Sequence, residues 1–177
     1  MTGGWVVRPA TPADAAGCAR VTVDTWRATY RGIVADEYLD SLSYQRQTER
    51  WAERLVGGQV CTHVAVTTGG TVVGYVGGGP ARDGGSAADG EVYAIYVLPG
   101  HQGTGIGRSL MAAAAASLVA AGRRSLLVWV LADNQAARRF YAALGAHQSA
   151  RQSISIGGRE YDEVAYTWPD ATRLTGP

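Results

Sequence analysis

A glycine-rich segment runs directly into a helix-forming stretch at residues 98–118, LPGHQGTGIGRSLMAAAAASL. Glycine loses the most backbone entropy on ordering, so Gly103, Gly105 and Gly107, packed so closely together, need a structural reason. The first N–H groups of a helix have no partner inside it and lie at the positive end of its dipole. The segment therefore predicts an anion site, such as one for a phosphate. The alternative is a tight turn with the helix packed closely on a sheet.

Two strongly apolar runs flank this segment. EVYAIYVL at residues 91–98 precedes the glycines, and SLLVWVL at 125–131 follows the helix. Both runs are apolar on both faces, which is typical of central strands covered by helices. Open α/β sheets bind ligands beyond the carboxyl ends of such strands. The order of strand, glycine loop, helix and strand therefore favours the phosphate interpretation.

Capping and turn residues predict the remaining elements. We expect an extended run at 6–8, helices at 12–30, 36–42, 43–58 and 133–145, a loop at 80–90, and hairpins at 61–79 and 152–168 that turn at Gly69–Gly70 and Gly157–Gly158. This order predicts an α/β fold of the α+β type, with a mixed sheet.

The length of 177 residues predicts one domain, with a core at about 5–168 and loose tails at 1–4 and 170–177. Hydrophobic residues make up 46% and charged residues 18%, as in globular proteins. The net charge of +1 gives no electrostatic reason to bind nucleic acid or a membrane surface. Any anion binding must therefore be local.

The cysteines and histidines indicate neither a disulfide framework nor a metal site. Cys18 and Cys61 are too few for either, and His63, His101 and His147 lack ligand spacing. The first residues also lack the pattern of a signal peptide, and no apolar run is suited to crossing a bilayer. We therefore expect a reduced, cytoplasmic protein without a metal.

The glycine loop is neither a P-loop nor a dinucleotide fingerprint, because GTGIGRS lacks both the Gly-Lys-Ser/Thr ending and the Gly-x-Gly-x-x-Gly spacing. EVYAIYVLPGHQGTGIGRSLM instead resembles motif A of the GCN5-related N-acetyltransferases, in which Gln/Arg-x-x-Gly-x-Gly/Ala is matched by Gln102, Gly105 and Gly107. VLADNQAARRFYAALGA resembles the second half of the same family. The resemblance extends over nearly the whole chain and implies a central sheet of about six to seven strands with helices on both faces.

The resemblance implies that the chain binds acetyl-CoA. The diphosphate would be held at the loop and helix start, by Gln102, Gly103, Thr104, Gly105, Ile106, Gly107 and Arg108. Many relatives have lysine where this chain has Thr104, which leaves Arg108 as the nearest cation. The pantetheine arm would pair with the backbone of Ile95, Tyr96 and Val97, in a slot where this strand bulges and splays from its neighbour, and would contact Asn134 and Tyr141.

Acetyl transfer to an amine needs a neutral nucleophile, a stabilised oxyanion and a proton for the leaving thiolate. The resemblance implies that Tyr141 is the general acid; the alternative is a tyrosine that packs its helix on the sheet. It implies that Glu91 is a base acting through water; the alternative is an exposed carboxylate at a strand end. A backbone N–H near Tyr96 or Val97 would meet the oxyanion, so that no side chain is required there.

The resemblance also places the acceptor between the first helices and the last hairpin. The implied substrate-binding residues are Trp26, Tyr30, Glu37 and Tyr161, with Ile33, Tyr38, Glu160 and Asp162 nearby. Aromatic rings and carboxylates suit a cationic amine. Trp26 and Tyr30, at helical spacing, are equally typical of a core.

The leading hypothesis is a direct acetyl transfer from acetyl-CoA to a primary amine in a ternary complex, with a small-molecule acceptor. A protein N-terminus or lysine is the alternative acceptor. A CoA-binding regulatory module without turnover is the alternative function. Because neither cysteine lies near the motifs, a covalent acetyl-cysteine route is not expected. The chain is expected to be a monomer or a homodimer.

Overall fold

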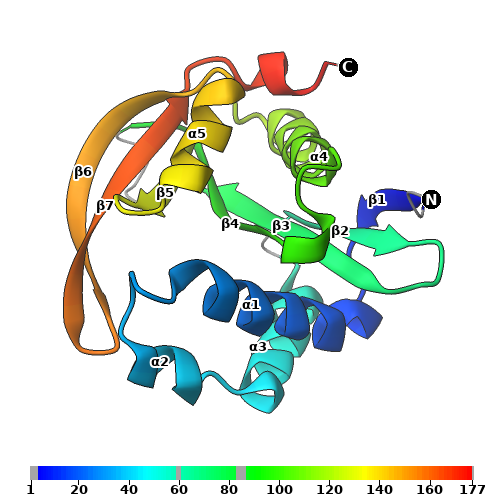
Figure 1. Cartoon of the computed structure of the whole chain (residues 1–177). Helices are drawn as coiled ribbons and strands as arrows, with labels where there is room; N and C mark the ends of the chain where they lie inside the picture. The colour runs from blue at the N-terminus through cyan, green and yellow to red at the C-terminus, as the bar shows by residue number, and fades with distance from the viewer. Residues whose placement is uncertain (1–3, 59–60, 83–86, 177) are drawn as a thin grey trace.

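The computed structural model describes residues 4–58, 61–82 and 87–176, and its centre is a seven-stranded sheet (Figure 1). The order across the sheet is β1-β2-β3-β4-β5-β7-β6, with β4 and β5 parallel and the other neighbours antiparallel. The strands are β1 (Trp5–Pro9), β2 (Cys61–Thr67), β3 (Val72–Pro80), β4 (Gly90–Val97), β5 (Leu126–Leu131), β6 (His147–Ile156) and β7 (Arg159–Trp168). The predicted mixed sheet is confirmed.

Helices cover both faces of this sheet (Figure 1). On one face α1 packs on β3, β4 and α3, with α2 beside it; on the other face α4 packs on β2, β3 and β4, and α5 lies next to β7. The helices are α1 (Ala15–Tyr30), α2 (Asp36–Ser41), α3 (Tyr44–Gly57), α4 (Ile106–Ala120) and α5 (Gln135–Ala143), with short 3-10 turns η1 (Pro12–Asp14), η2 (Pro99–His101) and η3 (Ala171–Leu174).

The boundaries follow the predicted caps and turns. The Ser43 hydroxyl accepts a hydrogen bond from the Arg46 N–H at the start of α3, and Gly58, with φ of +63°, follows its end. The last hairpin turns at Gly157–Gly158, as predicted. Part of the predicted loop at 80–90 belongs to β3, which extends to Pro80, and residues 83–86 of that loop lie outside the described residues.

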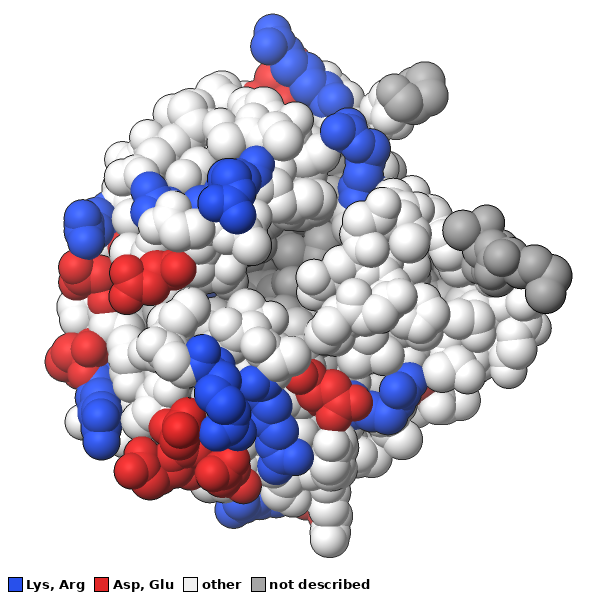
Figure 2. All heavy atoms as spheres, in the orientation of Figure 1, with Lys and Arg blue, Asp and Glu red and all other residues white. Residues whose placement is uncertain are grey.

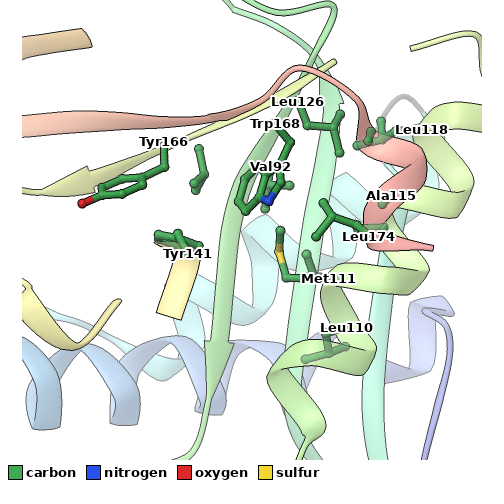
Figure 3. Packing of buried hydrophobic residues seen from close by; sticks show 14 of the residues in the cluster. Val92, Leu110, Met111, Ala115, Leu118, Leu126, Tyr141, Tyr166, Trp168 and Leu174 are labelled. Carbon is green, nitrogen blue, oxygen red and sulfur yellow. The ribbon is translucent and has the colours of Figure 1, made fainter. Parts of the chain in front are cut away.

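Residues 170–176 do not form a loose tail, which corrects the expectation for this part of the C-terminal segment; residue 177 lies outside the described residues. Ala171 and Leu174 of η3 are buried in the core that α4 forms with the sheet, and Figure 3 shows Leu174 beside Leu118 and Ala115 of α4. The Ala171 N–H also donates to the Arg124 carbonyl at 2.8 Å. Two apolar side chains in a short polar segment give no periodicity, so the sequence pattern misses this contact.

The two central strands separate toward their carboxyl ends. Among the described residues, β4 pairs with β5 through Gly90, Glu91 and Val92 alone, so the later residues of β4 have no strand partner there on that side. The register between β3 and β4 moves from Gly77 opposite Ala94 to Gly78 opposite Val92, which leaves a bulge at Tyr93. The splay and the bulge implied by the family resemblance are both present, and they open a slot between the helix layers.

Candidate functional site

A cavity of 460 Å³ lies in the slot between β4 and β5. Figure 2 shows this face hollowed near its centre, with mainly uncharged residues around the opening. The lining comes from four parts of the fold: Thr25, Thr29 and Tyr30 of α1; Tyr93–Val97 of β4 and Val128–Val130 of β5; Gln102, Gly103, Gly105, Gly107 and Arg108; and Asn134, Ala136, Ala137, Phe140, Tyr141, Ala143 and Leu144. The cavity therefore joins the glycine loop on one side of the sheet to α1 on the other.

The glycines of the loop have two different roles. Gly103 and Gly105 have φ of +73° and +90°, a region that favours glycine, and Gly105 is the N-cap of α4. At Gly107 a Cβ would lie 3.2 Å from the Phe140 ring, so this glycine lets α4 approach α5 closely. The tight turn and the close packing are therefore both present, at different glycines, and the anion site stays a prediction.

The start of α4 has the properties of an anion site. The first helical hydrogen bond runs from the Ser109 N–H to the Gly105 carbonyl, so the N–H groups of Ile106, Gly107 and Arg108 precede any acceptor of the helix. Gln102 donates through Nε2 to the Val97 carbonyl at 2.9 Å, which ties the loop to the end of β4. Arg108 is the one charged side chain among the described residues that line the cavity.

Tyr141 reaches the cavity from α5 while its ring packs in the core. Its ring centroid lies 6.0 Å from those of Tyr166 and Trp168, and the side chain is almost fully buried (Figure 3). Burial raises the pKa of the Tyr141 phenol above its ordinary value, so the hydroxyl keeps its proton at neutral pH. The packing role and a proton-donor role are compatible at this position.

Glu91, the predicted base, is not among the residues that line the cavity. Its carboxylate is 2% exposed and accepts hydrogen bonds from the backbone N–H and the guanidinium of Arg82, at 3.0 Å from the N–H and from Nε. The Arg82 guanidinium also lies over the Tyr93 ring, 5.0 Å from its centroid. These contacts tie the end of β3 to the start of β4 and give no support to a base, so that role stays a prediction.

The ion pair makes a stability prediction. We expect Arg82→Ala to lower the free energy of unfolding by about 1–3 kcal/mol, because it leaves the Glu91 carboxylate buried with little compensation. Glu91→Gln should lower the free energy of unfolding by less, since it removes the buried charge as well as the ion pair. Urea unfolding checks both variants. If Glu91→Gln instead abolished turnover without changing stability, the carboxylate would act as a base.

The predicted acceptor residues divide into two groups. Trp26, Tyr30 and Tyr161 belong to one apolar cluster with Tyr38, in which the Trp26 and Tyr30 ring centroids are 4.6 Å apart. The Tyr161 hydroxyl accepts a hydrogen bond from the Ala35 N–H at 3.1 Å. Glu37 is apart from this group.

Of this cluster, Tyr30 alone lines the main cavity; Tyr161 lines a separate open hollow between the last hairpin and the segment after α1. The Glu37 side chain is 83% exposed and lies 3.9 Å from the Arg159 guanidinium. Glu37 lines neither hollow.

Sequence reasoning missed two threonines of the cavity wall, Thr25 and Thr29. They are four positions apart and so share a face of α1 with Tyr30 close by. That spacing was the available signal, but it does not distinguish a cavity wall from an ordinary helix surface. Within the described residues, no three His, Cys, Asp or Glu side chains are placed to hold a metal ion, and no helix has the length and apolar character needed to cross a membrane.

A family model described as Acetyltransferase (GNAT) family matches residues 16–146, which contain nearly all of α1 together with the glycine loop, the splayed strands and α5. The chain belongs to this family. It is accordingly an N-acetyltransferase that uses acetyl-CoA, and the fold and family implied by the glycine motif are confirmed.

Individual relatives agree with this assignment. The N-acetyltransferase YuaI of Bacillus subtilis is 38% identical over 168 residues, 95% of each chain. The structure of the yncA acetyltransferase from Salmonella typhimurium, with its cofactor acetyl-CoA, aligns with a TM-score of 0.69 at 23% identity, over 93% of both chains. Mycothiol acetyltransferase of Kocuria rhizophila is 47% identical over 62 residues, but this match covers 35% of the present chain and 20% of that protein.

Proposed function

We propose that this N-acetyltransferase acetylates the primary amine of a small molecule, by direct attack on acetyl-CoA in a ternary complex. One observation carries the proposal: a single cavity runs from the start of α4, through the gap between β4 and β5, to the hydroxyl-bearing wall of α1. Donor and acceptor can therefore meet in the gap from opposite sides of the sheet.

The donor side fits acetyl-CoA. The Gln102 N–H donates to the Pro99 carbonyl at 3.3 Å, so the loop and helix start would hold the diphosphate through the N–H groups of Gly103 to Arg108, which have no backbone acceptor among the described residues. Arg108 adds a positive charge. Beyond Val92, the edge of β4 that faces β5 is unpaired, and there the backbone of Ile95 to Val97 would bind the amide groups of the pantetheine arm like an added strand. When bound, acetyl-CoA supplies an acetyl thioester for attack.

The residues around the gap have separate tasks. Tyr141 holds a proton that it donates to the departing thiolate sulfur, and its burial keeps that proton in place. A backbone N–H of β4 meets the oxyanion. The incoming ammonium loses its proton to solvent before attack, because the described residues that line the cavity include no carboxylate. We therefore propose no direct role for Glu91 in this step.

The contacts between the last hairpin and the region of α2 favour a small molecule. The last hairpin is joined to the region of α2 by the Tyr161–Ala35 hydrogen bond, and Gly157 packs so closely that a Cβ there would lie 2.8 Å from Tyr38. These contacts narrow the space that an extended peptide would need. The matching segment of the mycothiol acetyltransferases, which by name act on a small molecule, agrees with this proposal.

A panel of acceptors tests the proposal. Purified protein, acetyl-CoA and either small primary amines or peptides are mixed, and release of the CoA thiol is measured together with the mass of the product. We expect turnover with at least one small amine and slower turnover with every peptide. Turnover confined to peptides would reverse the choice of acceptor, and thiol release without an acetylated product would contradict amine acetylation.

The direct route predicts that no acetyl-enzyme forms. The Cys18 thiol is fully buried, and burial raises its pKa to about 12; Cys61 does not line the cavity. We therefore expect the intact mass of the protein to stay unchanged after incubation with acetyl-CoA alone, and the Cys61→Ser variant to keep its turnover. A stable acetyl adduct on either cysteine that transfers to the amine would contradict the ternary complex.

A further inference from the structure

The Asn134 side chain has a fixed orientation in the cavity wall. Its Oδ1 accepts a hydrogen bond from the Ala137 N–H at 3.1 Å and so caps the start of α5. Because the cap requires the oxygen, the amide nitrogen must face the other way. There Nδ2 donates to the hydroxyl of Tyr30 at 3.4 Å.

This contact determines what the Tyr30 hydroxyl can do. A phenol oxygen that accepts a hydrogen bond keeps its own hydrogen available for donation. Tyr30 is 7% exposed and lines the cavity, and within the described residues no protein acceptor takes this hydrogen. Burial raises the pKa of Tyr30 more than the Asn134 contact lowers it, so the hydroxyl stays protonated at neutral pH. The α5 cap therefore leaves Tyr30 as a hydrogen-bond donor toward the cavity.

A second observation indicates that this wall of α1 meets a polar ligand. Thr25 is 4% exposed and lines the same cavity, and its buried hydroxyl has no hydrogen-bond partner in the part of the chain that the structure describes. An unpaired buried hydroxyl is unfavourable and uncommon in folded proteins. Two polar groups of α1 that line the same cavity, Thr25 and Tyr30, thus lack a complete set of partners among the described residues, where the acetyl group and the amine would meet.

We infer that the Tyr30 hydroxyl is a catalytic hydrogen-bond donor to the thioester carbonyl oxygen, held in its donor orientation by Asn134. This inference rests on the proposed function. As the amine attacks, the carbonyl becomes a tetrahedral centre and its oxygen gains negative charge, which a donor aimed from α1 stabilises. The C–S bond then breaks, the thiolate takes the Tyr141 proton, and the attacking nitrogen releases its surplus proton to solvent, from which Tyr141 regains one. Tyr30 keeps its proton throughout. A side-chain donor to the oxyanion differs from the expectation that no side chain is required there.

A double-mutant cycle tests the inference. Tyr30→Phe removes the donor. Asn134→Asp keeps an oxygen for the α5 cap but replaces the Nδ2 donor with a carboxylate oxygen. The Tyr30 hydroxyl would then donate its hydrogen to this carboxylate and not toward the cavity. At saturating acetyl-CoA we expect each variant to lower kcat about 100-fold, and the double variant to be no slower than Asn134→Asp.

Tyr75→Phe is the matched control, since it removes a buried phenol whose partner is Thr22 and which does not line the cavity. It should keep kcat even if it lowers stability.

Two results would overturn the inference. One is a Tyr30→Phe enzyme with the wild-type kcat. The other is a double variant whose fold loss of kcat equals the product of the losses in the two single variants. If the wild-type protein acetylates no amine at all, the proposed function fails instead, so the two failures are distinguishable.

Discussion

Gly105→Glu should abolish the binding of CoA while the protein stays folded. Any other residue at φ of +90° is strained, and the added carboxylate would lie at the N-cap of α4, where the diphosphate is expected. Loss of the free N–H geometry together with charge repulsion should weaken binding more than about 100-fold, a change of about 2.8 kcal/mol. Titration calorimetry with CoA measures this loss.

Gly122→Glu is the matched control for Gly105→Glu. Gly122 has φ of +85°, open space around its Cβ position, and lies just beyond the opposite end of α4. The same substitution therefore brings the same backbone strain and charge to a place far from the predicted phosphates. We expect it to keep CoA binding. Equal loss in both variants would show that strain in α4, and not the anion site, is responsible.

Tyr141→Phe should lower kcat about 100-fold with little change in the affinity for acetyl-CoA. The variant keeps the ring that packs on Tyr166 and Trp168 and removes the hydroxyl alone, so the free energy of unfolding should change little. Steady-state kinetics with the best amine, together with calorimetry, separate these two quantities. A variant that kept the full rate would leave Tyr141 with its packing role only.

Tyr166→Phe controls for the loss of a phenol in the same aromatic cluster. Tyr166 is buried beside Tyr141, accepts a hydrogen bond from Arg138 at 3.3 Å and does not line the cavity, so its variant should keep kcat.

The pH profile adds a second check on the acid. An alkylamine has a pKa of about 10, so kcat/KM should rise from pH 7 to 9 as the amine loses its proton. Because the pKa of Tyr141 is raised, the acid stays protonated over this range and should cause no fall in rate.

The local parts of the fold could be predicted because single residues determine them. Ser43 marks the start of α3 and Gly58 its end, and the last hairpin turns at Gly157–Gly158. Each of these features depends on contacts within a few positions in the sequence. The C-terminal segment could not be predicted in this way. Its burial depends on Leu174 meeting α4, more than fifty residues earlier in the chain, and a short segment carries no pattern for such a contact.

The same distinction applies to the site. Gly103 and Gly105 signal the loop conformation by their residue type, and the structure has them at positive φ. The surroundings of Glu91 depend on Arg82, which reaches it from the end of a different strand. The donor orientation of Tyr30 depends on a cap more than a hundred residues away, at Asn134. Such tertiary contacts have no periodicity to reveal them.

The central claim is that unpaired main-chain N–H groups at the start of α4 hold the diphosphate of acetyl-CoA. Calorimetry with CoA, dephospho-CoA and pantetheine tests it most directly, because dephospho-CoA keeps the diphosphate and pantetheine lacks it. We predict similar affinities for the first two and an affinity about 100-fold lower for pantetheine. Equal binding of CoA and pantetheine, or no binding of CoA at millimolar concentration, would contradict the account.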